Sequence, residues 1–375
     1  MMQKTKLYEE HLALGAKMSP FAGWDMPLYY KSAMDEHLSV RERAGMFDVS
    51  HINVVDITGS DAFAFMQLIL ANDVSKLNKA GRAMYSCMLN EQGGVIDDLV
   101  IYYLGKNYYR VVANASRKTV DLEWLGRCRK SFLEAPSKVG EVPRSRCTSR
   151  GMTVPLISKN IDIKVVKDVA IIAVQGPLAR DKVHTILPKE QVQLVEGLAR
   201  FDSVIIDNIF IARTGYTGED GYEIILSNNN AVSLWRKLLE VGVTPCGLVA
   251  RDSLRLEAGF CLYGNDLDEK HTPFESSLDW TIPTLEREFI GKDALRKQRE
   301  QGVKNKLVKL KLCENGVLRR GQKVIVENVG EGIITSGGFA PNLKCSIALA
   351  RIPVCDCSEC LVEVRGEFIK AQITG

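Results

Sequence analysis

The chain has 375 residues, of which 46% are hydrophobic and 25% are charged, and its formal net charge is +3. This length predicts two or three domains, and this composition is typical of a globular protein. The small net charge and the lack of a dense basic stripe give no reason to expect nucleic acid. No apolar run approaches the roughly 20 residues that a membrane-spanning helix needs.

The first eleven residues are polar and resemble neither a signal peptide nor a mitochondrial presequence, so we expect a cytoplasmic protein that engages no membrane. Most of the ten cysteines are scattered singly, as small packed residues are. The cluster at residues 355–360 has three cysteines and no nearby histidine, whereas a tetrahedral zinc site takes four ligands. We therefore expect no metal.

Helices and strands alternate irregularly over about the first 285 residues. Capping residues, glycines and turn signals mark their ends. This mixture predicts an α+β fold rather than the regular rhythm of a doubly wound sheet. The predicted elements are a helix over 35–44, a helix from Ser60 or Asp61 to 71, a hairpin of strands 84–89 and 95–103, a strand at 108–113, a helix capped by Ser116, a strand at 169–174, a helix from Pro177, a strand at 203–212 and a helix over 231–240.

Two later regions differ in character. Residues 126–160 carry eight Lys or Arg against two Asp or Glu, together with three prolines, which predicts a solvated surface loop, with a basic docking loop as the alternative. After about residue 290, a charged helix over 292–301 is followed by short apolar segments between turn residues. That spacing predicts a small β-barrel or sandwich.

Two adjacent aspartates, Asp97 and Asp98, interrupt the apolar strand expected at 95–103. Because side chains alternate along a strand, the two carboxylates must point to opposite faces, and neither face looks solvated. A buried carboxylate costs several kcal/mol unless it is paired, hydrogen-bonded or used in chemistry. The alternative is structural, with one Asp capping the hairpin turn and the other meeting a buried cation.

Two further segments are rich in polar groups. Residues 214–223 contain three glycines, which let the backbone approach a ligand, but the segment lacks phosphate-loop spacing. Residues 247–259 form an expected helix with Arg251 and Arg255 on one face, where Asp252 or Glu257 could also pair with them. Carboxylates, a guanidinium, tyrosines and flexible backbone suit the binding of a flat polar heterocycle.

The sequence resembles the T-protein of the glycine cleavage system, an aminomethyltransferase family, from about residue 7 to residue 373. Several dense matches in the same order make this similarity far more specific than a single motif. They are FAGWDMPLYY (21–30), RERAGMFDVSH (41–51), NEQGGVIDDLVIYY (90–103), QGP (175–177), TGYTGEDGYE (214–223), CGLVARDSLRLEAG (246–259), LYGNDLDE (262–269) and ITSGGFAPNLKCSIALARIP (334–353).

The resemblance implies a tetrahydrofolate-dependent transfer with no metal. In this family the N5 atom of tetrahydrofolate, the co-substrate, attacks the methylene carbon of an aminomethyl group. The lipoyl arm of the partner H-protein carries that group. Ammonia leaves, the dihydrolipoyl arm is freed, and methylenetetrahydrofolate forms.

The resemblance also implies site residues. Asp98 matches the family's catalytic acid, which is thought to orient the folate and assist proton movement near N5. Glu223, rather than Glu219, matches the carboxylate that holds the pterin through paired hydrogen bonds. The other matches line the folate cavity or lie beside the folate, and they are Tyr85, Asn114, Tyr216 and Arg251.

The implied fold has three lobes: two interleaved α+β lobes that bind folate and a C-terminal β-barrel. We expect lobe 1 at about 1–52 plus 165–285, lobe 2 at about 53–164 with the basic insertion 126–160, and the barrel domain at 286–375. The chain departs from the family pattern in this insertion, in Ile52 where a Met is usual, and in ending at Gly375 before the family's short tail.

Two alternatives share the fold. A non-catalytic folate-binding protein that supports iron–sulfur assembly would carry a KGCYxGQE-type motif, where this chain has LYGNDLDE. The folate-using half of a sarcosine or dimethylglycine oxidase would follow a flavin domain with a dinucleotide fingerprint, which this sequence does not contain.

Overall fold

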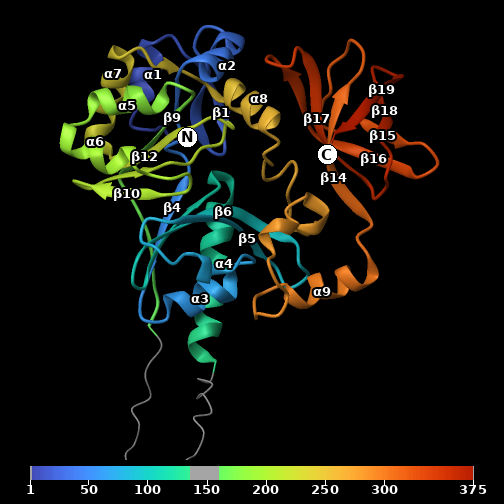
Figure 1. Ribbon diagram of the computed structural model, residues 1–375, viewed down its shortest axis with the longest axis horizontal. Coiled ribbons are helices and arrows are strands. Elements are labelled where there is room, and N and C mark those ends of the chain that lie inside the picture. The colour runs from blue at the N-terminus through green and yellow to red at the C-terminus, as the bar shows by residue number, and fades with distance from the viewer. Residues whose placement is uncertain (1, 136–159, 375) are drawn as a thin grey trace, which may run out of the picture.

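A computed structural model describes residues 2–135 and 160–374. Figure 1 shows a six-stranded sheet with its helices at the upper left, a five-stranded sheet below it and a closed barrel at the right. A separate hairpin pairs β1 (Lys17–Phe21) with β2 (Trp24–Tyr29). This arrangement confirms the predicted α+β class and the C-terminal barrel. The residue limits of the two lobes stay a prediction.

The six-stranded sheet has the order β10-β11-β12-β9-β3-β13. Its central strand β9 is buried on both faces, since Ile172 and Val174 pack into one apolar cluster and Ile171 and Ala173 into another. This double burial explains why its sequence is apolar without alternation. The strands are β3 (Gly45–Asp48), β9 (Val169–Gln175), β10 (Ser203–Ile206), β11 (Ile209–Ala212), β12 (Gly221–Ser227) and β13 (Thr244–Pro245).

Helices cover one face of this sheet, and α8 leads from it toward the barrel (Figure 1). The apolar sides of α5 and α7, including Val183 and Trp235, pack against β9 and β12. Gly259 ends α8 in the left-handed conformation that favours glycine. These helices are α1 (Tyr8–Ala13), α2 (Ala33–Glu42), α5 (Ala179–Ile186), α6 (Lys189–Glu196), α7 (Asn228–Glu240) and α8 (Leu248–Ala258).

The five-stranded sheet has the order β5-β6-β7-β4-β8. Residues of α3 and α4 cover one face, and the other face meets the six-stranded sheet in a cluster that includes Val54, Tyr102 and Phe210. The elements are β4 (Asn53–Thr58), α3 (Ala62–Ile69), η1 (Val74–Lys76), β5 (Ala83–Leu89), β6 (Val95–Gly105), β7 (Tyr108–Ala113), η2 (Ala115–Arg117), α4 (Lys118–Glu134) and β8 (Asp162–Val165).

The barrel closes because β14 pairs with both β17 and β19, giving the order β14-β17-β16-β15-β18-β19. Its alternating inward residues, such as Leu310, Val324 and Val362, form a separate core. Leading into and forming the barrel are η3 (Phe274–Ser276), η4 (Asp279–Thr281), α9 (Lys292–Gln301), β14 (Asn305–Leu312), β15 (Lys323–Val326), β16 (Gly330–Ala340), β17 (Cys345–Pro353), β18 (Glu359–Val364) and β19 (Glu367–Thr374).

A buried ion pair joins α8 to the barrel. Arg255 is 1% exposed and donates through Nη1 to Asp266 Oδ2 at 2.9 Å. Its Nη2 donates to Ser336 of β16 at 2.9 Å, and Asp266 Oδ1 accepts from the Thr335 hydroxyl at 2.5 Å. Arg351 of β17 donates to the Asp266 carbonyl at 2.7 Å. The barrel is therefore fixed to the helix that also carries Arg251.

The structure corrects several sequence-based predictions. The expected strand 203–212 is a hairpin, because Asp207 and Asn208 adopt positive φ and turn the chain inside an apolar run. In the predicted loop 126–160, residues up to Glu134 continue α4, held by the packing of Trp124 and Cys128. Residues 136–159 lie outside the described part.

Smaller corrections concern helix starts. Ser116 lies inside η2 and does not cap α4, whose N-cap is Arg117. The helix expected from Pro177 begins two residues later, at Ala179. None of the helices described for residues 2–135 and 160–374 has the length and apolar character needed to cross a membrane.

Candidate functional site

Asp98 lies at the centre of a hydrogen-bonded group on the five-stranded sheet. The Tyr85 hydroxyl of β5 donates to Asp98 Oδ2 at 3.0 Å. Asn114, directly after β7, donates through Nδ2 to Asp98 Oδ1 at 2.9 Å and to its carbonyl at 3.0 Å. The structure thus brings together three of the six predicted site residues. Both carboxylate oxygens of Asp98 are fixed in direction.

Asp97 points to the opposite face of β6, as the alternation of the strand predicts. It is 0% exposed and accepts from the Asn114 backbone N–H at 3.0 Å and from Asn114 Nδ2 at 2.8 Å. Asn90, rather than either aspartate, caps the hairpin turn by accepting from the backbone N–H of Gln92 and of Gly94. Neither aspartate therefore caps the turn, and this part of the structural alternative is wrong.

The other three predicted residues gather on the six-stranded sheet and α8. The guanidinium carbon of Arg251 lies 4.9 Å from the centre of the Tyr216 ring. Glu223, on β12, accepts from the Thr214 hydroxyl at 2.6 Å. Tyr216 donates its hydroxyl proton to the carbonyl of Cys261. Arg251 Nη1 is buried without a hydrogen-bond partner among the described residues, so this guanidinium has a donor to offer.

The two groups are within electrostatic reach of each other. Burial is the main reason that the pKa of Tyr216 is raised, and the negative charge of Asp98 adds to the rise. All six predicted residues are half-buried, which is the exposure expected of side chains that line an open site. The six candidate residues therefore come from the two sheets that meet in the shared apolar cluster, and from α8.

Burial also sets the ionisation of the charged residues. It raises the pKa of Asp98 to about 6, although the hydrogen bonds from Tyr85 and Asn114 act in the opposite direction. Burial lowers the pKa of the Arg251 guanidinium, and the negative charge of Glu223 opposes that effect. His51 has its pKa lowered to about 4 by burial, so its ring is neutral at pH 7.

Sequence reasoning missed two exposed aromatic residues beside these groups. Trp280 of η4 stacks on Tyr85 with ring centres 5.5 Å apart, and Phe260 stacks on Tyr216 at 5.8 Å. The side chains of Trp280 and Phe260 are 59% and 39% exposed. Phe260 lies in an irregular segment after α8 and Trp280 in a single 3₁₀ turn, both too short for a periodic pattern to indicate which way a side chain points. Their clustering becomes visible only in three dimensions.

Sequence reasoning also missed Thr214, whose hydroxyl lies between Glu223 and Tyr102. Its oxygen is 2.6 Å from Glu223 Oε2 and 2.9 Å from the Tyr102 hydroxyl. Thr214 thus fixes one carboxylate oxygen of Glu223. The three glycines of residues 214–223 pointed to this loop. They did not indicate Thr214, because its partner Tyr102 comes from the other sheet.

The arrangement offers a carboxyl group with a raised pKa, a second carboxylate, a buried guanidinium and flat aromatic surfaces. Such groups can hold a flat heterocycle with N–H donors and can accept or return a proton. In the described residues, no group of three or more His, Cys, Asp or Glu side chains is arranged to hold a metal ion.

Comparison with known proteins agrees with this chemistry. The family model "GCVT N-terminal domain" matches residues 7–285, and "Glycine cleavage T-protein C-terminal barrel domain" matches residues 305–375. An aminomethyltransferase of Legionella pneumophila (strain Paris) is 47% identical over 375 residues, covering 100% of this chain and 97% of that protein. One of Methylococcus capsulatus is 46% identical over 371 residues, covering 98% and 94%.

A solved structure gives the same result. The crystal structure of glycine cleavage system aminomethyltransferase T from Bartonella henselae matches with a TM-score of 0.87 and 32% sequence identity. The match covers 100% of this chain and 97% of that chain.

Proposed function

This chain belongs to the glycine cleavage T-protein family and is an aminomethyltransferase, and we propose that tetrahydrofolate and the lipoylated H-protein are its substrates. The methylene carbon loses its bonds to the lipoyl sulfur and to the amino nitrogen, and it becomes bonded to N5 and N10 of tetrahydrofolate. Ammonia and the free dihydrolipoyl thiol are the other products. The full-length similarity to aminomethyltransferases supports this reaction, and the half-buried Asp98 between Tyr85 and Asn114 carries the assignment of its chemistry.

In this proposal the Asp98 carboxylate assists attack by N5. A carboxylate in a site that excludes most water stabilises a cationic centre better than one in bulk water. Tyr85 and Asn114 fix its two oxygens, so little reorganisation is needed as charge develops. The protein forms no covalent bond in this scheme.

The other site residues bind the folate. Glu223, with one oxygen fixed by Thr214, accepts hydrogen bonds from the N–H groups of the pterin. Arg251 offers its unpartnered Nη1 to an acceptor on the same ligand, and Tyr216 packs between Arg251 and Phe260. A cytoplasmic location and the absence of a metal in the reaction stay predictions.

The direct test measures methylenetetrahydrofolate formation from aminomethyl-loaded H-protein and tetrahydrofolate, after a calorimetric titration with tetrahydrofolate alone. We expect both binding and turnover. Folate binding without turnover would favour the alternative, a non-catalytic folate-binding protein that supports iron–sulfur assembly. Nothing in the comparisons favours that alternative.

The pH dependence of kcat/KM tests the ionisation of Asp98. Because the carboxylate is the active form and its pKa is raised to about 6, kcat/KM should fall tenfold per pH unit below about pH 6. Tyr85→Phe removes a hydrogen bond that lowers this pKa, so its acid limb should move up by roughly half to one pH unit. If the acid side of the kcat/KM profile does not move in Tyr85→Phe, a group other than Asp98 causes the fall in kcat/KM.

Glu223→Ala tests the pterin contact. Loss of a charge-assisted hydrogen bond of about 1.5–3 kcal/mol should weaken tetrahydrofolate binding about 10- to 100-fold, without changing affinity for the H-protein. Glu219→Ala is the matched control, from the loop that leads into β12. Glu219 pairs with Arg41 at 2.8 Å, and the folate affinity of this variant should change less than about twofold. Equal weakening for both ligands in Glu223→Ala would indicate misfolding.

A further inference from the structure

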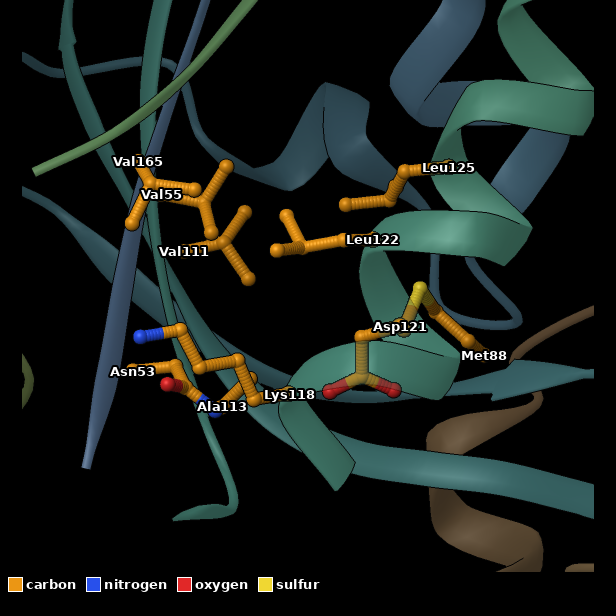
Figure 2. Close-up of a pocket in the computed structure, with 10 residues that line it drawn as sticks. All are labelled: Asn53, Val55, Met88, Val111, Ala113, Lys118, Asp121, Leu122, Leu125 and Val165. Carbon is orange, nitrogen blue, oxygen red and sulfur yellow. The ribbon is translucent and has the colours of Figure 1, made fainter. Parts of the chain in front are cut away.

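Asp97 and Asp121 form a pair of carboxyl groups behind the site. The pair lies on the face of β6 turned away from Asp98. Asp121 lies in the first turn of α4 and is 3% exposed. Both of its oxygens are buried, and no described residue donates to them unless a carboxyl proton lies between Asp121 and Asp97. Figure 2 shows its carboxylate turned away from the aliphatic side chains around a cavity of about 10 Å³.

Two buried carboxylates in contact do not both stay ionised. Burial raises the pKa of Asp121 to about 7, against a hydrogen bond with Asp97. Burial and the neighbouring charges of Asp121 and Asp98 raise the pKa of Asp97. A single proton between the two groups satisfies the otherwise unpartnered Asp121 and removes the repulsion.

Asn114 connects this pair to Asp98. Its Nδ2 donates to Asp97 Oδ1 at 2.8 Å, and it also donates to Asp98, at 2.9 Å to Oδ1 and 3.0 Å to the carbonyl. Its backbone N–H also donates to Asp97 Oδ2. With two bonds to Asn114, Asp97 sets the direction in which the Asn114 amide points. Asn53 restrains the residue further by donating to its carbonyl at 2.9 Å.

We propose that Asp97 and Asp121 share one proton and act as a positioning pair, which holds the Asn114 amide against Asp98. This inference rests on the proposed function, because the pair serves that reaction. Neither residue touches the substrates in this scheme. Asp121 acts through Asp97, and Asp97 acts through Asn114.

Few other groups near the pair change their charge around neutral pH. The Arg117 guanidinium donates to the carbonyl of Ile96 and to Glu269. Burial raises the pKa of the Cys87 thiol and of the Tyr263 hydroxyl, so both stay neutral. Between roughly pH 5 and 8, the groups that titrate here are the pair and Asp98.

Two substitutions at Asp121 test the positioning role. In Asp121→Leu the partner that shares the proton is lost, so the carboxyl group of the buried Asp97 carries a proton of its own and no longer accepts fully from Asn114. We expect kcat to fall about 10-fold or more, with KM for tetrahydrofolate within about threefold. Asp121→Asn supplies an amide donor of the same shape and should restore most of the lost kcat. An unchanged kcat in Asp121→Leu, or an equal loss in both variants, would overturn the positioning role.

The shared proton has a readout that needs no activity. The folded chain holds this proton at pH values where the unfolded aspartates, with pKa near 3.9, have lost it. Stability of the unliganded wild type should therefore fall as pH rises from about 5 to 8, and the melting temperature of Asp121→Asn should fall less. If the melting temperatures of the wild type and Asp121→Asn changed equally with pH, the shared proton would be contradicted. A wild type without turnover would instead contradict the proposed function and leave the slope comparison intact.

Discussion

Asp98→Asn should lower the rate of methylenetetrahydrofolate formation by about 10³-fold or more, while tetrahydrofolate still binds within about fivefold of the wild-type affinity. The amide has the shape of the carboxylate but carries no charge and offers one acceptor oxygen. Tyr85 and Asn114 both donate to this side chain, so one of them loses its acceptor. The measurements are single-turnover rates with loaded H-protein and calorimetry with tetrahydrofolate.

The matched control is Glu91→Gln in the turn of the same hairpin, where the side chain is exposed. We expect its rate and affinity to equal those of the wild type. If Asp98→Asn keeps more than about a tenth of the wild-type rate, its carboxylate does not assist the attack. Loss of folate binding together with a lower unfolding midpoint would show damage to the fold instead.

Asp266→Ala should destabilise the protein by about 3–5 kcal/mol, because it leaves the Arg255 guanidinium buried without its main counter-charge. Asp252, the other carboxylate that Arg255 contacts, has a side chain that is 56% exposed and cannot replace Asp266. Ser336 loses its carboxylate acceptor in the same step, and Thr335 keeps only the Leu349 carbonyl at 3.1 Å. Urea unfolding, followed by tryptophan fluorescence, measures the change.

A double-mutant comparison separates this ion pair from simple loss of packing. Arg255→Met with Asp266→Leu removes both charges, and we expect it to be less destabilised than Asp266→Ala. Lys323→Ala, which removes a solvent-exposed pair with Glu331 on the barrel, should cost no more than about 1 kcal/mol. A double variant as unstable as the single one would show that the apolar contacts, rather than the charges, dominate.

Much of the fold follows from local rules. The hairpin of β5 and β6 and the opposite faces of Asp97 and Asp98 follow from apolar runs and strand alternation. The expected strand 203–212 failed because Asp207 and Asn208, both able to adopt positive φ, lie inside a run that is otherwise apolar. Helix α4 was missed beyond residue 126 because its packing against α3, and not its composition, keeps it helical.

The candidate site, too, was only partly predictable from local patterns. Similarity of motifs selected six residues, and the structure shows that they form two groups, one on the five-stranded sheet and one on the six-stranded sheet and α8. Asp121 could not be recognised from the sequence, since it looks like an ordinary first-turn acid of a helix. The partner that makes it unusual, Asp97, lies 24 positions earlier on another element. Contacts between distant segments are what the local patterns omit.

The order in which the chain visits the two sheets has a consequence for synthesis on the ribosome. Strand β3 precedes the whole five-stranded sheet, but its partners β9 and β13 follow it. The residues between β4 and β8 can therefore fold while β3 still has no strand to pair with. Met46 and Phe47 of β3 are buried in the folded protein, but until β9 has emerged they have no neighbouring strand to pack against.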